Sequence, residues 1–176
     1  MNINLFTGLM GSVILLVGAE WTESNKISNP LKSIKNWLFA IGGFVMLLYA
    51  IFGYQQGGSI FFVILEILIV IASVLMMLDT NDKIDIPIIS ILGICLVTWS
   101  LYLFDGYSTI IFILGLCGVG LGYTFKMASL RRSVALTIGS ILITMFSYIE
   151  MNWIFFYLNL FFAIFSSYYV YKALKK

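Results

Sequence analysis

The stretch IFFVILEILIVIASVLMML, residues 60–78, decides the class of this protein. Glu66 and Ser73 are its only polar side chains. A transmembrane helix needs about 20 predominantly apolar residues to cross about 30 Å of hydrocarbon. Because unpaired backbone groups are too costly in lipid, we expect this segment to be a membrane-spanning α-helix.

The composition of the whole chain extends this interpretation beyond residues 60–78. Of the 176 residues, 61% are apolar and 10% are charged, whereas soluble domains hold about 45–50% apolar and about 25% charged residues. A water-soluble globular protein is therefore excluded. The chain has no histidine and only two cysteines, Cys95 and Cys117, so the usual ligands of zinc and haem are missing. We expect no cofactor and no bound metal.

Six further apolar segments have a similar length. The seven predicted spans are residues 3–19, 36–54, 60–78, 86–104, 109–125, 133–149 and 153–171. If all seven cross the membrane, the ten lysines and arginines all fall on one side, which the positive-inside rule makes the cytoplasmic side. We therefore expect an all-α integral membrane protein of seven helices in the bacterial cytoplasmic (inner) membrane. Its N-terminus is expected outside and its C-terminus inside.

The first three and the last three predicted spans resemble each other. Residues 8–11 (GLMG) match residues 115–118 (GLCG), and residues 41–43 (IGG) match residues 138–140 (IGS). This order predicts a parallel 3+1+3 repeat about an axis along the membrane normal, an architecture of transporters with a site at the repeat interface. The first repeat, the linker helix and the second repeat are predicted at residues 1–78, 79–108 and 109–176. Chance similarity between glycine-containing apolar helices is the alternative.

Two parts of the chain carry a resemblance to a known family. They are residues 36–42 (NWLFAIG) with residues 48–52 (LYAIF), and residues 153–172. Together with the three-plus-one-plus-three order, they resemble the second and last helices of the PnuC-like vitamin transporters, a branch of the SWEET and PQ-loop superfamily. The chain lacks the Pro-Gln motif of the superfamily, and residues 133–149 lack the tryptophan pair of the nicotinamide riboside carriers. The resemblance implies a carrier and leaves its solute open.

Glu66 is the only acidic or basic residue well inside a predicted span. A charge near the bilayer centre costs about 2.5–3.5 kcal/mol on insertion scales, so such residues usually face the interior and have a role. Asn159 occupies nearly the same depth in the last span. The two residues could form a solute or proton site between the repeats, or they could join helices through hydrogen bonds. For Asn159 alone the structural interpretation is favoured.

A hydroxyl face and three aromatic residues complete the candidate substrate site. Ser140 and Thr144 belong to a row of hydroxyl groups at helical spacing on span 133–149. This row either lines a water-filled path or packs tightly against a neighbouring helix. The deeper aromatic residues, which could stack on a flat solute or pack in lipid, are Tyr49, Trp99 and Tyr157. Gly118 and Gly122 on span 109–125 have GxxxG spacing, which predicts a close approach of two helix backbones.

These features favour a small membrane carrier that moves a small uncharged solute, vitamin-like or nucleoside-like, by a passive or ion-coupled mechanism. We expect membrane lipid and the solute as partners, expect no nucleic acid, and leave a homo-oligomer open. The alternative is a structural or regulatory membrane subunit without a transport pathway. An enzyme is disfavoured, because acid–base catalysis normally needs two positioned groups and Glu66 alone is available at depth.

Overall fold

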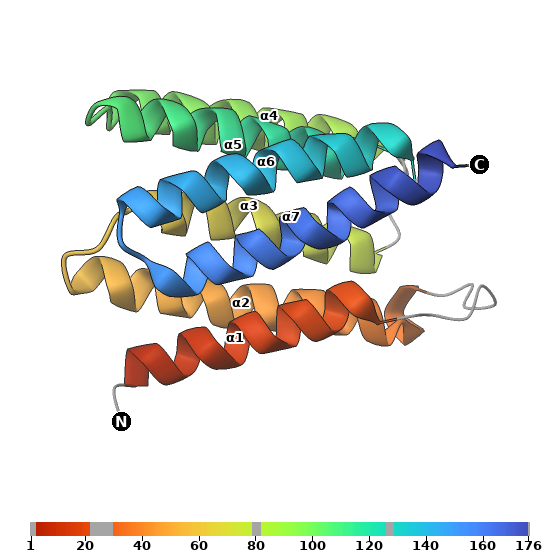
Figure 1. The fold of residues 1–176 in the computed structure, drawn as a ribbon, viewed down its shortest axis with the longest axis horizontal. Helices are drawn as coiled ribbons and strands as arrows, with labels where there is room; N and C mark the ends of the chain where they lie inside the picture. The colour runs from red at the N-terminus through yellow and green to blue at the C-terminus, as the bar shows by residue number, and fades with distance from the viewer. Residues whose placement is uncertain (1–2, 22–29, 79–81, 126–128, 176) are drawn as a thin grey trace. The chain divides into compact units, whose positions relative to one another are not determined.

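The structure is a computed structural model that describes residues 3–21, 30–78, 82–125 and 129–175. This part of the chain is helical and contains no strand (Figure 1). The helices are α1 (Ile3–Glu20), η1 (Pro30–Lys32), α2 (Ile34–Gln55), α3 (Phe61–Leu78), α4 (Asp82–Tyr102), α5 (Tyr107–Thr124), α6 (Leu130–Ile149) and α7 (Trp153–Leu174). Among these residues, seven helices are long and apolar enough to cross a membrane. The prediction of seven membrane-length helices is therefore confirmed.

Capping residues explain where two of the helices begin. The Oγ atom of Ser33 accepts a hydrogen bond from the N–H of Asn36 at 3.0 Å and so caps α2. Ser129 caps α6 in the same way through the N–H of Arg132 at 3.2 Å. The apolar pattern alone starts this span at residue 133, because the first turn of α6 is charged. The serine cap moves the observed start back to Leu130, as such caps do.

The chain divides into two compact units, Met1–Asp85 and Ile86–Lys176. The first unit contains α1, α2 and α3, and the second contains α5, α6, α7 and most of α4. The boundary falls just after the start of α4, the helix that is predicted to link the two repeats.

In the first unit, α2 packs against both α1 and α3. Glycines bring α1 and α2 close together. A Cβ atom on Gly42 would lie 2.8 Å from Cγ of Leu15, and one on Gly11 would lie 3.0 Å from Cγ of Met46. Small residues at such contacts let helix backbones approach closely, which matters in lipid because burial of apolar surface does not drive helices together there.

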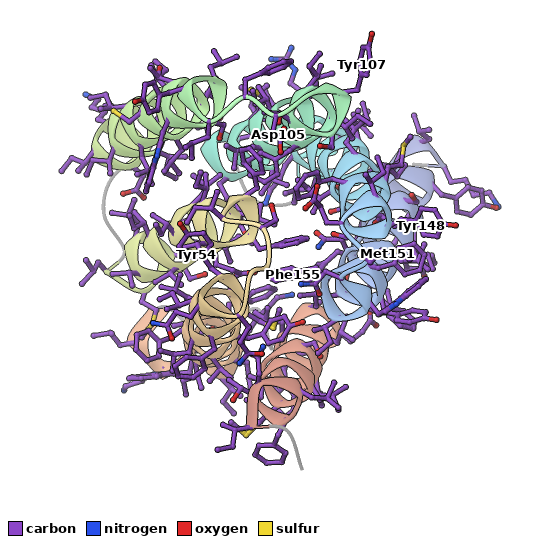
Figure 2. The ribbon with its side chains drawn as sticks, turned by 90° about the vertical axis from the view of Figure 1, so that its left-hand side faces the viewer. Tyr54, Asp105, Tyr107, Tyr148, Met151 and Phe155 are labelled. Atoms are coloured by element: carbon purple, nitrogen blue, oxygen red, sulfur yellow. The ribbon has the colours of Figure 1, made fainter. Side chains whose placement is uncertain are left out.

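In the second unit, α6 packs against both α5 and α7. The turns that join α4 to α5 and α6 to α7 lie at one end of this unit, as Asp105 and Met151 show in Figure 2. Glu150 belongs to the same end, because it directly follows α6. Arg131 at the start of α6 and Lys172 near the end of α7 lie at the opposite end. These two basic residues of the second unit thus lie at the end opposite to the two turns.

The two units differ at positions that the predicted repeat makes equivalent. Gly11 lies against Met46, whereas its predicted counterpart, Gly118, lies against Gly139. Gly139 is the predicted counterpart of Gly42 and not of Met46. The contact between the first two helices of each repeat is therefore shifted by about one helical turn. The 3+1+3 repeat and the orientation of the termini stay predictions.

Single cysteines test the topology in a background in which Cys95 and Cys117 are replaced by alanine. Gln56→Cys and Asp105→Cys lie in exposed turns and should react with an impermeant thiol reagent in intact cells, because both turns are expected outside. Lys172→Cys, exposed near the end of α7, should react only after the membrane is permeabilised. Labelling of all three in intact cells, or the reverse pattern, would contradict the predicted topology.

Candidate functional site

Glu66 stands out among the described residues because it is an acid buried without a partner. It lies in α3 with a relative exposure of 0%. Its Oε1 and Oε2 atoms are buried and have no hydrogen-bond partner among the described residues. A buried polar group without a partner costs free energy, and a charged one costs more. This carboxyl group therefore requires a hydrogen-bond donor, a cation or a proton.

The neighbouring helix α2 presents no donor at the level of Glu66. The two helices are joined by a short turn and are antiparallel, and a Cβ atom on Gly43 would lie 3.5 Å from Cγ2 of Val70. Continuing this register along both helices places Glu66 level with Met46 and Leu47. Neither of these side chains carries an N–H or O–H group. The part of α2 at this level is therefore apolar.

No described lysine or arginine lies deep in a span. Each lies in η1 or within one turn of the end of an α-helix. The remaining three basic residues, Lys26, Lys126 and Lys176, lie outside the described residues. In the first unit, Nζ of Lys35 donates to the carbonyl oxygen of Ala19 at 3.4 Å, at the end of the unit where α3 terminates. With a rise of 1.5 Å per residue, Glu66 lies about 18 Å along α3 from that end.

Eight hydroxyl or amide side chains in the described spans donate to the carbonyl oxygen four positions earlier in their own helix, at 2.7–2.9 Å. The pairs are Thr7 with Ile3, Ser73 with Ile69, Thr98 with Ile94, Ser100 with Leu96, Thr137 with Ser133, Thr144 with Ser140, Ser147 with Ile143, and Asn159 with Phe155. An ionised carboxylate cannot use this solution, because it has no hydrogen to donate.

The hydroxyl face of α6 lies beside a close contact between the backbones of α5 and α6. Ser140 and Thr144 are buried. Directly before Ser140, a Cβ atom on Gly139 would lie 2.6 Å from the backbone nitrogen of Val119, and one on Gly118 would lie 2.7 Å from Cα of Gly139. The expected close backbone approach at Gly118 is therefore present, with Gly139 as its partner. A solute-binding role for the hydroxyl groups stays a prediction.

The three candidate aromatic residues have different surroundings. Tyr49 is half-buried on α2. Trp99 is 44% exposed and Tyr157 is 54% exposed. The ring of Tyr157 lies 5.1 Å from that of Phe156 and 6.4 Å from that of Trp153, measured between centroids, near the α6–α7 turn. This group matches the aromatic belts that membrane proteins place at the lipid–water interface. Stacking of Trp99 or Tyr157 on a solute stays a prediction.

The candidate residues divide between the two units. Glu66 and Tyr49 belong to the first unit, and Tyr49 lies two or three residues from the level of Glu66, toward the α2–α3 turn. The candidates in the second unit are Trp99, Ser140, Thr144, Tyr157 and Asn159. The sequence interpretation missed Met46, which lies level with Glu66 and against Gly11. The short α2–α3 turn was the available signal, because it sets the antiparallel register of the two helices.

Comparison with known proteins assigns no family to this chain. No protein-family model matches it, and neither a curated protein nor a solved structure does. The resemblance to the SWEET and PQ-loop superfamily therefore stays a prediction from the sequence. Function has to be argued from the chemistry of the side chains.

Gly139→Ala tests the close contact between α5 and α6. The added methyl group would lie 2.6 Å from the backbone nitrogen of Val119, so the helices would have to separate. Overpacking of this kind costs ~1–3 kcal/mol, and we expect a lower unfolding temperature in detergent. Gly93→Ala is the matched control, because no atom lies within 4 Å of its added Cβ and alanine favours a helix over glycine. Equal stability of both variants would contradict the contact.

Proposed function

We propose that this protein is a small membrane carrier that moves a small uncharged solute, vitamin-like or nucleoside-like, by a passive or ion-coupled mechanism. Glu66 carries the proposal, because it is a fully buried acid inside an 18-residue apolar helix and has no hydrogen-bond partner among the described residues. Ionisable residues in transmembrane segments typically mark solute paths, ion paths or proton relays. In this proposal the solute path passes Glu66.

A purely structural role accounts poorly for Glu66. Hydrogen bonds between transmembrane helices contribute about 0.6 kcal/mol on average, whereas a charged side chain at the centre of a span costs about 2.5–3.5 kcal/mol on insertion scales. Glu66 makes no hydrogen bond to any described residue. The side chain therefore has the unfavourable insertion free energy of an acid in an apolar helix, and no hydrogen bond to another helix offsets it. Binding of a solute or an ion to Glu66 would supply the favourable free energy that offsets this cost.

The second candidate function is a structural or regulatory membrane subunit without a transport pathway. The second unit favours it, because the buried hydroxyl groups of Ser100, Thr144 and Ser147 donate within their own helix. The α5–α6 contact is also tightly packed at Gly118 and Gly139. Such helices need no solute to be stable. The two candidates differ in what they require of Glu66: the carrier needs it for binding, and the subunit needs it only for the fold.

Glu66→Gln separates these candidates, because it keeps the shape of the side chain and removes the exchangeable proton. We expect the variant to remain folded in the membrane, with a free energy of unfolding within ~1 kcal/mol of the parent. Uncharged nucleosides and ring vitamins, screened by thermal unfolding in detergent, should include one that stabilises the parent protein. A ligand at 100 times its Kd stabilises by ~2.7 kcal/mol, and Glu66→Gln should lose this gain.

Glu150→Gln is the matched control, since it makes the same chemical change directly after α6 and outside the spans. It should keep both the stability and the ligand-induced shift. If Glu66→Gln binds and moves the same solute with unchanged pH dependence, the proposed site is wrong. If it unfolds at a lower temperature and no solute stabilises the parent, the subunit is supported instead.

A further inference from the structure

We propose that Glu66 is a proton-binding site, so that the ion coupled to transport is H⁺. This inference rests on the proposed carrier function and deepens it by naming the coupling ion. It is carried by three observations, which concern the chemistry of a carboxyl group inside a helix, the basic residues of the chain, and the side chains that face Glu66.

The first observation is that an ionised Glu66 cannot use the hydrogen bond that eight polar side chains in the described spans make. Hydroxyl and amide groups there donate to a carbonyl oxygen of their own helix, as Ser73 does to Ile69 in α3 at 2.8 Å. Backbone N–H groups inside a helix are already engaged, so an ionised carboxylate finds no donor. A protonated carboxyl group has one O–H and can donate it as the hydroxyl groups do. Protonation therefore makes Glu66 neutral and lets it donate a hydrogen bond to a carbonyl oxygen of its own helix.

The second observation is that no lysine or arginine among the described residues lies deep enough in a helix to pair with Glu66. Within the first unit, α2 and η1 pack against α3. Their charged groups are Lys35 and Lys32, both at the end of α3 that lies about 18 Å from Glu66. The other ionisable groups of α2 are Tyr49, two or three residues from the level of Glu66, and Tyr54, which is exposed at the end of α2. No described basic residue of this unit is therefore placed to neutralise Glu66.

The third observation selects a proton over a metal cation. Hard cations such as Ca²⁺ and Mg²⁺ require about six or more oxygen ligands, including water, at well-defined positions. At the level of Glu66, α2 presents Met46 and Leu47, and neither has an oxygen in its side chain. Met46 is also fully buried against Gly11. This side of Glu66 cannot supply a ligand shell, and a proton needs none.

The proton step requires no other reactant than water. In the open state, one carboxylate oxygen of Glu66 takes a proton from water on one side of the membrane and forms a neutral carboxylic acid. In the second open state, the acid returns that proton to water on the other side and regenerates the carboxylate. Solute movement coupled to this cycle carries one proton for each turnover of Glu66.

Infrared difference spectroscopy of the purified protein in lipid bilayers tests this inference without a known solute. The parent protein and Glu150→Gln should both show the C=O stretch of a protonated carboxylic acid that is missing in Glu66→Gln. The band should shift in D₂O, and its amplitude should fall to the background when the buffer is changed from acidic to alkaline. This combination identifies an acid that exchanges its proton with water.

Two results would overturn the inference. One is the absence of any acid band that depends on Glu66 at every pH, which would mean a permanently ionised carboxylate held by another cation. The other is a band that neither shifts in D₂O nor changes with pH, which would mean a sealed structural acid. If Glu66→Gln does not fold, Glu66→Asp keeps the acid, and its band should be displaced from that of the parent. If the band shifts in D₂O and changes with pH but no solute stabilises the protein, the proposed carrier function is contradicted and the proton site is supported.

Discussion

The hydrocarbon core of a membrane offers no hydrogen-bond partners, and the described structure follows from that constraint. Every backbone group within it has to be satisfied by a helix, so the apolar segments become seven helices. The polar side chains obey the same constraint by donating to their own helix, as Thr144 does to Ser140 and Asn159 does to Phe155. Glu66 is the residue that the helix cannot satisfy by itself.

Helix contacts in this chain depend on small residues, because burial of apolar surface does not hold helices together in lipid. In the first unit Gly11 and Gly42 admit Met46 and Leu15. In the second unit Gly118 and Gly139 let two backbones meet. The first contact also places an apolar and fully buried side chain at the level of Glu66. Packing and the candidate site are therefore linked through Met46.

The helices were predictable from the sequence because both the length and the apolarity of a span are local properties. The residues at which helices begin were less predictable. Ser129 caps α6 ahead of a charged first turn, and a search for apolar segments does not include that turn. The burial of Glu66 was predictable from its cost in lipid. The exposure of Trp99 and Tyr157 was not, because which face of an apolar helix meets lipid is set by packing and hardly at all by composition. The hydroxyl row on α6 was predicted as one face of a helix. The hydrogen bonds that Thr137, Thr144 and Ser147 donate to carbonyl oxygens of α6 were not predictable, because they depend on side-chain rotamers.

The central claim is that the missing partner of Glu66 comes from outside the protein. An experimental structure of the protein in lipid, at a resolution that shows ordered water, tests this claim most directly. The account predicts density for water or a solute within hydrogen-bond distance of Oε1 or Oε2 of Glu66. A dry surrounding in which both oxygens accept hydrogen bonds from protein side chains would contradict it.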